Sequence, residues 1–165
     1  MTERDLPGVL AVQLGCYPPD YHEPESAFRA KLGQCPDTCW VIACPDGAQT
    51  GLIAAYLVCL PVAAGVLPAL HQGDWQRPQQ ATALYLHDLA VGPALRGRGA
   101  ATQLIEQATQ AARQRGLNQL ALVAVQGSVP FWQKHGFQDA SLTGSERPTS
   151  LRTFGPSATF MTRAS

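Results

Sequence analysis

The segment 82–116 constrains the fold most, because an apolar strand runs through a glycine-containing turn into a long amphipathic helix. Residues 82–91 read as a strand, and the spacing over 98–115 predicts a helix. One helical stripe there is apolar and comprises Ala101, Leu104, Ile105, Ala108, Ala111 and Ala112. Gly116 follows as a stop signal for that helix. A strand joined directly to a helix predicts α/β or α+β structure.

The remaining pattern predicts one domain over residues 1–165. Helices are expected from Asp5-Leu6-Pro7 to Pro18-Pro19, over 25–32 and over 128–136. Further strands are expected at 38–43, 52–60, 120–125, near 137 and at 158–161. Pro45-Asp46-Gly47 is a turn signal between the first two of these strands, and 61–80 is a long connection.

Composition excludes several classes of protein. The chain has 12 basic and 12 acidic residues, so its net charge of zero argues against a non-specific nucleic-acid binder. The uncharged run 52–70 is interrupted by prolines and a glycine, which argues against membrane insertion. Five cysteines without a C-x-x-C pair argue against a metal site. The polar start carries no signal peptide, so a cytoplasmic protein with reduced thiols is expected.

The turn before the long helix is a predicted anion site. The first N–H groups of a helix lack partners within the helix and carry positive partial charge. Gly97 and Gly99 have no side chain that would keep a ligand away from these groups. Arg96 and Arg98 add charge at the rim. The P-loop spacing is absent, and Thr102 replaces the third glycine of a dinucleotide fingerprint. A plain connecting turn and a binder of another phosphate ligand, such as a nucleotide, remain alternatives.

Two further patterns stand at a suitable separation: Arg96-x-x-Gly99-x-Ala101 after an apolar strand, and residues 131–137, which read FWQKHGF. The first resembles the signature Arg/Gln-x-x-Gly-x-Gly/Ala, and the second resembles the segment F-Y-x-K-x-G-F, of the GNAT superfamily of N-acetyltransferases. The resemblance covers nearly the whole chain. It implies a mixed sheet splayed between the strands near 82–91 and 120–125, with helices on both faces. The family's first strand normally precedes the first helix; here it is absent, or the recorded start is late.

The resemblance also implies acetyl-CoA as co-substrate, with no metal. Backbone groups of Leu89, Ala90 and Val91 would pair with the pantetheine arm, and the N–H of Val91 would polarise the thioester carbonyl. The pyrophosphate would be held by backbone N–H groups of Arg96, Gly97, Arg98, Gly99, Ala100 and Ala101. Phe131 and Trp132 would lie near the acetyl and sulfur end.

His87 and Asp88 are the candidate catalytic residues. The family's polyamine acetyltransferases carry a glutamate at the position of His87, and the ordinary pKa of histidine, ~6.5, suits a base. A hydrogen-bonded strand histidine is the alternative. Strand alternation places Tyr85, His87 and Leu89 on one face and Leu86, Asp88 and Ala90 on the other, so both candidates reach one cleft only if a bulge intervenes. Trp132 stands where the family usually has the tyrosine that serves as general acid. Val125 stands at a position where the family often has an asparagine.

The expected acceptor is a primary amine of a small molecule that is polyamine-, amino-acid- or antibiotic-like. Asp20, Glu23 and Glu25 would favour a cation, or they form a solvated acidic turn. The connection 61–80, with His71, Asp74 and Trp75, would cover the acceptor. A non-catalytic acyl-CoA-binding or sensor module and acetylation of a peptide or protein amine are the alternatives. No nucleic-acid or membrane partner is expected, and the chain is expected to be a monomer or homodimer.

Overall fold

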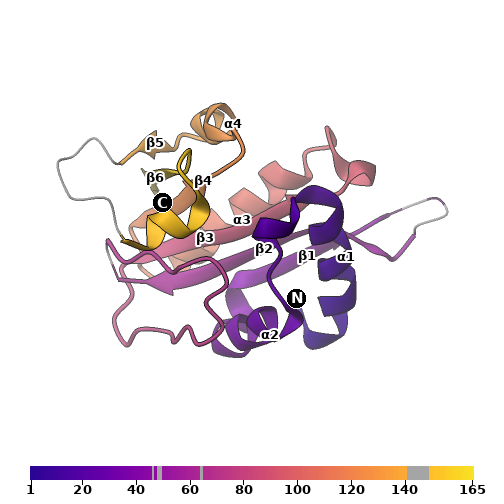
Figure 1. Cartoon of the computed structure of the whole chain (residues 1–165), viewed down its shortest axis with the longest axis horizontal. Coiled ribbons are helices and arrows are strands. Elements are labelled where there is room, and N and C mark those ends of the chain that lie inside the picture. Colours follow the sequence, from indigo (N-terminus) through magenta and orange to yellow (C-terminus); the bar gives the residue numbers. More distant parts are fainter. Residues whose placement is uncertain (46, 48–49, 64, 141–148) are drawn as a thin grey trace.

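A computed structural model describes residues 1–45, 47, 50–63, 65–140 and 149–165. Six strands form one mixed sheet in the order β1-β2-β3-β4-β6-β5 (Figure 1). The strands are β1 (Cys39–Ala43), β2 (Ile53–Val62), β3 (Ala83–Val91), β4 (Gln119–Ala124), β5 (Gln138–Asp139) and β6 (Thr159–Ala164). The α-helices are α1 (Leu6–Cys16), α2 (Glu25–Gln34), α3 (Ala100–Gln114) and α4 (Val129–Lys134). Short 3-10 helices in the connections include η2 (Pro19–Tyr21), η5 (Pro93–Leu95) and η7 (Thr149–Phe154).

The helices cover both faces of the sheet, as predicted. In Figure 1, α1 and α2 lie in front of the strands and α3 lies behind them. On the α3 side, Leu104 and Ile105 belong to one core cluster with Leu86 of β3. On the α1 side, Leu6 and Phe28 share a second cluster with Tyr56 and Tyr85. The mixed α/β fold predicted from the sequence is confirmed.

The sheet opens between β3 and β4, as the family resemblance predicted. These parallel strands pair only from Ala83↔Gln119 to Leu86↔Leu122. Beyond that point β4 continues beside β6, whereas residues 88–91 of β3 pair only with β2. The end of β3 therefore presents one backbone edge to a gap rather than to a neighbouring strand.

A β-bulge at His87 changes the faces of β3. Val58 pairs with Asp88 and Cys59 pairs with Leu86, so His87 is an extra residue in β3. The predicted alternation is therefore wrong beyond this residue: Leu89 packs on the α3 side with Leu86, and Ala90 lies in the α1 cluster with Tyr85. Because the bulge shifts the alternation by one residue, His87 and Asp88 both face the α1 side.

Some element boundaries differ from those predicted. Strand β2 continues through Pro61 to Val62, because the pairing with β1 ends at Val58 and Pro61 needs a sheet partner only on the β3 side. On α1 the predicted apolar position Leu14 is 64% exposed, whereas Gln13 is buried. The predicted turn at 45–47 includes residue 46, which lies outside the described residues. Of residues 1–5, before α1, Glu3–Asp5 form a 3-10 helix and none lies in a strand.

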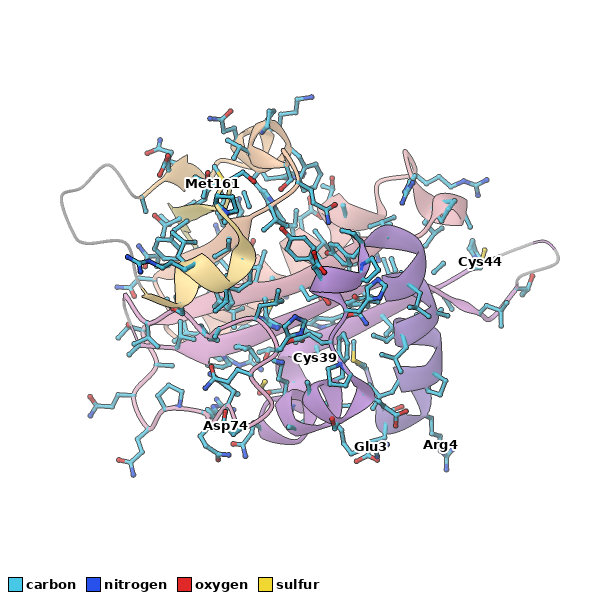
Figure 2. The ribbon with its side chains drawn as sticks, viewed as in Figure 1. Glu3, Arg4, Cys39, Cys44, Asp74 and Met161 are labelled. Carbon is cyan, nitrogen blue, oxygen red and sulfur yellow. The ribbon has the colours of Figure 1, made fainter. Side chains whose placement is uncertain are left out.

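Charged side chains lie mainly outside the core. Figure 2 shows Glu3 and Arg4 pointing away from the body, whereas Cys39 lies within it and is buried.

In the described ranges, none of the helices has both the length and the apolar composition that crossing a bilayer requires.

Candidate active site

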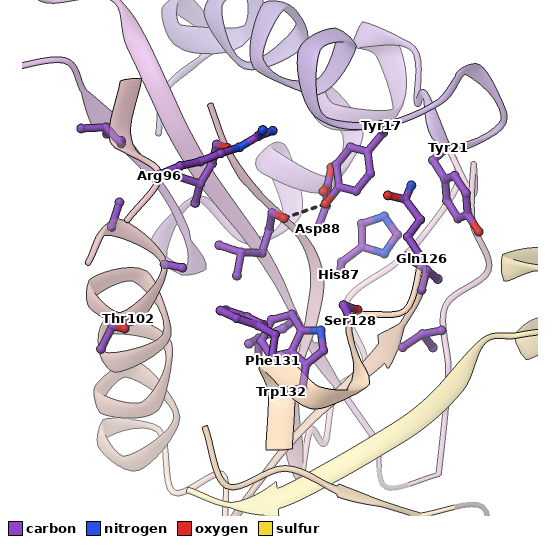
Figure 3. Close-up of a pocket in the computed structure, with 18 of the residues that line it drawn as sticks. Tyr17, Tyr21, His87, Asp88, Arg96, Thr102, Gln126, Ser128, Phe131 and Trp132 are labelled. Atoms are coloured by element: carbon purple, nitrogen blue, oxygen red, sulfur yellow. Dashed lines mark hydrogen bonds between the residues drawn. The ribbon is translucent and has the colours of Figure 1, made fainter. Parts of the chain in front are cut away.

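A cavity of about 540 Å³ occupies the gap between β3 and β4. Arg96 and Thr102 lie toward one end in Figure 3, and Tyr21 and Gln126 lie toward the other, with His87 and Asp88 between them. The predicted residues that line it are Glu23, His87, Asp88, Leu89, Val91, Arg96, Gly97, Gly99, Ala100, Ala101, Phe131 and Trp132. Two further predicted residues, Ala90 and Arg98, do not line it.

The α3 end of the cavity has the backbone expected of an anion site. Gly97 and Gly99 adopt φ values of 73° and 80°, a left-handed conformation that glycine tolerates without strain, and Gly99 is the N-cap of α3. The N–H of Arg98 is used within the turn, donating to the carbonyl of Leu95 at 3.2 Å. The Arg96 side chain folds back on β3, where its Nε donates to the carbonyl of Val91 at 3.1 Å.

The backbone of β3 presents alternate residues to the cavity. Gly92 N–H donates to the carbonyl of Ala54 at 2.8 Å, which places Gly92 in a hydrogen-bonded pair with β2. Since such pairs alternate along antiparallel strands, Leu89 and Val91 direct their backbone groups away from β2, and Ala90 directs its groups toward β2. The Leu89 carbonyl accepts a hydrogen bond from the Tyr17 hydroxyl at 2.6 Å.

His87 is held by a buried carboxylate. Its Nε2 lies 3.0 Å from Oε2 of Glu23, and its side chain is 1% exposed. Glu23 precedes α2, and Lys31 of α2 donates from Nζ to both of its oxygens, at 2.8 and 3.0 Å. The Nδ1 atom of His87 is buried and, among the residues that the structure describes, has no hydrogen-bond partner.

The charges around Glu23 decide its ionisation. Burial by itself raises the pKa of this carboxyl group, but the charges of His87 and Lys31 and their hydrogen bonds outweigh it and hold the pKa at about 2. Glu23 is therefore a carboxylate at neutral pH. The predicted acidic rim does not form as a unit, since Asp20 and Glu25 are exposed and Glu25 pairs with Arg29.

Asp88 lies beside tyrosine hydroxyl groups. Its Oδ2 accepts a hydrogen bond from the Tyr56 hydroxyl at 2.7 Å, and Tyr17 lies beside it in Figure 3. Burial raises the pKa of Asp88, although the hydrogen bond from Tyr56 opposes the shift. Burial, with the nearby Asp88 charge, also raises the pKa of Tyr17 and of Tyr56, so both remain O–H donors.

The aromatic pair on α4 forms the opposite wall of the cavity. Trp132 is buried and stacks edge-on against Phe137, with ring centroids 5.5 Å apart. Phe131 is 37% exposed, and the centroid of its ring lies 4.7 Å from the centroid of the His135 ring. Both rings line the cavity below His87 and Asp88 in Figure 3.

The far end of the cavity comes from segments distant in sequence. The cavity-lining residues not singled out from sequence include Tyr17, Tyr21, Leu70, Gln126, Ser128 and Phe154. Gln126 has φ 53°, which is uncommon for a residue with a side chain and is often found at functional sites. No local pattern marked these residues, apart from the position of Gln126 immediately before Gly127 at the end of a strand.

The connection 61–80 reaches this end of the cavity at Leu70. Leu70 lines the cavity, and its N–H donates to Thr153 Oγ1 at 3.1 Å. The N–H of His71 donates to Oε1 of Glu23 at 2.9 Å. None of the three residues predicted to cover the acceptor lines the cavity: His71 is exposed beside Glu23, Trp75 is buried in the α1-side core, and Asp74 is exposed.

The family model described as "Acetyltransferase (GNAT) family" matches residues 6–137, which is most of the chain. The chain belongs to the GNAT family. A search of curated protein sequences found no match. The resemblance inferred from the Arg96–Ala101 turn and residues 131–137 is thereby confirmed at the level of the family.

Several solved structures share the GNAT acyltransferase fold with this chain. The loading GNATL domain of CurA from Lyngbya majuscula aligns with TM-score 0.74 and 13% identity, over 98% of this chain and 93% of that chain. GphF, a GNAT-like decarboxylase in complex with isobutyryl-CoA, aligns with TM-score 0.71 and 20% identity, over 99% and 96%. The ribosomal-protein-S18-alanine N-acetyltransferase from Escherichia coli aligns with TM-score 0.65 and 17% identity, over 99% and 90%. At these identities the likeness establishes the fold alone.

Proposed function

We propose that this GNAT protein is an acetyl-CoA-dependent N-acetyltransferase that acetylates a primary amine of a small molecule by direct attack in a ternary complex. The observation that carries the proposal is one continuous cavity whose lining extends from the glycine turn before α3 to His87 and Asp88. A phosphate-bearing acyl donor and an amine acceptor fit its two ends.

The chain's own groups suit the acyl donor. The pyrophosphate would lie at the N-terminus of α3, where Gly97 and Gly99 leave backbone N–H groups open to an anion. The pantetheine arm would follow the free edge of β3, pairing with backbone groups of Leu89 and Val91. Acetyl-CoA, when bound, supplies the activated thioester, and the N–H of Val91 would stabilise the charge that develops on its carbonyl oxygen.

His87 would act as the general base. An ordinary amine, with a pKa of ~10, is mostly protonated at neutral pH and must lose a proton before it attacks. Glu23 accepts from Nε2 of His87, which leaves the lone pair of Nδ1 to receive that proton. Asp88, at the same place in the cavity, would hold the cationic form of the amine before it is deprotonated.

The leaving thiolate would depart without a proton from a tyrosine. The indole of Trp132 does not titrate usefully, and the pKa of Tyr17 is raised above that of an ordinary phenol, far above the ~8.5 of a thiol. Proton transfer from Tyr17 would therefore run uphill. A thiolate is a tolerable leaving group, and Tyr17 remains a hydrogen-bond donor at this place.

Ligand-dependent thermal stabilisation tests the donor. Acetyl-CoA at about 100 times its dissociation constant should stabilise the fold by ~2.7 kcal/mol, whereas ATP and NAD should have no effect. Stabilisation by ATP or NAD alone would point to a nucleotide-binding protein instead.

Release of free thiol from acetyl-CoA with a panel of small amines tests the reaction. His87→Gln should keep acetyl-CoA binding and lose about 10²–10⁴-fold in turnover, the usual contribution of a general base. Asp74→Asn, on the exposed part of the 61–80 connection, should leave turnover unchanged. If only peptide substrates are acetylated, the acceptor is a peptide or protein amine rather than a small molecule.

A non-catalytic acyl-CoA-binding module is the second candidate, and Trp132 favours it. Its ring is buried against Phe137 at the place where the family usually has a tyrosine hydroxyl. This candidate is correct if the wild-type protein binds acetyl-CoA but acetylates no amine, and if Trp132→Tyr creates turnover.

A further inference from the structure

We propose that Glu23 and Lys31 are positioning residues that hold the imidazole of His87 as its Nε2–H tautomer, and so make Nδ1 the atom that accepts a proton. The part of this inference that concerns catalysis rests on the proposed function. The tautomer itself is a property of the folded chain and is measurable without any substrate.

The carboxylate of Glu23 is surrounded by donors from three separate segments. Oε1 accepts from Lys31 Nζ at 2.8 Å and from the backbone N–H of His71 at 2.9 Å. Oε2 lies 3.0 Å from Lys31 Nζ and 3.0 Å from Nε2 of His87. The side chains of Lys31 and Glu23 are 0% and 2% exposed, so the network is shielded from water.

The backbone of Glu23 is held as firmly as its side chain. Gln13 of α1 donates from Nε2 to the Glu23 carbonyl at 3.0 Å, and its Oε1 accepts from the Glu23 N–H at 2.9 Å. Gln13 is 1% exposed, which explains why a polar residue occupies an inward position of α1. The backbone and the side chain of Glu23 are thus both held in place beside β3, where His87 projects from the bulge.

Stability alone does not account for this arrangement. Taking two charges out of water costs about as much as their attraction returns, and apolar residues of similar volume often serve as well. Lys31 is one of two lysines in the sequence, and it is fully buried. A buried charge pair that contacts a histidine at a cavity wall is better explained by what it does to the imidazole.

The direction of the hydrogen bond follows from the ionisation of Glu23. Paired with the buried Lys31 ammonium group at 2.8 Å, Glu23 is a carboxylate and can only accept, so the hydrogen between the two groups belongs to Nε2 of His87. A neutral imidazole then carries its lone pair on Nδ1. That atom is buried and, in the part of the chain that the structure describes, unpartnered, as is the hydroxyl of the adjacent Tyr85. Orphaned buried polar atoms of this kind call for a ligand atom or a water.

The decisive measurement is the tautomer of His87 by long-range 1H–15N correlation in the full chain, labelled with 15N-histidine, at about pH 8.5, where an ordinary imidazole is neutral. The wild-type ring should show a protonated Nε2 and an unprotonated Nδ1. The variant Glu23→Met/Lys31→Met removes both charges together, and its His87 should change to a mixture of tautomers. The matched control Glu25→Gln/Arg29→Gln removes an exposed ion pair of the same region and should leave the His87 signals unchanged.

Turnover separates positioning from a merely structural role. In Glu23→Met/Lys31→Met, kcat should fall about 10–100-fold while the KM for acetyl-CoA stays within a factor of two, because only the base loses its orientation. A wild-type ring protonated on Nδ1 overturns the proposal even if the variant does not fold. An unchanged tautomer or unchanged kcat in the folded variant overturns it as well. If no amine is acetylated but the tautomer depends on the pair as expected, the proposed function fails and the tautomer assignment stands.

Discussion

Lowering the pH from 6 to 3 should destabilise the folded chain in part through Glu23. The carboxyl group has an ordinary pKa of 4.5 in the unfolded chain and about 2 in the folded one. A depressed folded-state pKa means that the unfolded state binds the proton more tightly. The stabilising contribution is therefore complete above pH 4.5 and is lost as the pH falls toward 2.

The magnitude follows from the two pKa values. A difference of about 2.5 pH units corresponds to about 3 kcal/mol at neutral pH, of which about 2 kcal/mol is lost by pH 3. Since small domains are stable by about 5–15 kcal/mol, one carboxyl group accounts for a visible part of the acid sensitivity.

Urea unfolding at pH 6, 4 and 3 measures this contribution. Between pH 6 and 3, wild-type protein should lose about 2 kcal/mol more than Glu23→Met/Lys31→Met, which has no carboxyl group at this place. Glu25→Gln should keep the wild-type dependence, because that carboxylate is exposed and its ion pair with Arg29 is screened by water. The reasoning is refuted if the Glu23 variant and the wild type lose stability in parallel.

The remaining predictions concern glycines. Gly8→Ala should destabilise by about 1–3 kcal/mol, because an added Cβ would lie 2.7 Å from Ile53 Cγ1; thermal unfolding should show a lower Tm. Gly15→Ala, in the same helix with open space around it, should instead stabilise by about 0.5–1 kcal/mol, and an equal effect of both substitutions would contradict the packing argument. Gly99→Ala meets no atom but requires φ 80°, so it should cost about 1–2 kcal/mol and weaken acetyl-CoA binding in calorimetry more than Arg98→Ala does; equal losses would contradict the backbone account.

Residues close together in sequence are where the predictions were most accurate. The strand, the turn with Gly97 and Gly99, and the helix that follows were predicted within a few residues, and the cavity brings most of the nominated residues together. Short-range conformational preferences decide such features, because a glycine turn and an apolar helical stripe are encoded within about 20 residues. The family resemblance rested on the same segment and on residues 131–137.

The far end of the cavity was largely missed. Tyr17, Leu70 and Phe154 converge there from three distant segments, and no local spacing encodes such a meeting. The sequence predicts Glu23 only as one of three acids that would favour a cationic acceptor, and it gives Lys31 no role at the site. Their roles depend on a contact with His87, which lies 64 residues beyond Glu23.

The sequence by itself determined the strand–turn–helix unit, the family and the two candidate catalytic residues. Tertiary structure decided which way those two residues face. The register of β2 against β3 makes His87 the extra residue of a bulge, which turns it and Asp88 to one face. The burial of Lys31 beside Glu23 sets the charge that faces the imidazole. Register and burial arise only when distant segments pack, because each depends on neighbours that local sequence does not specify.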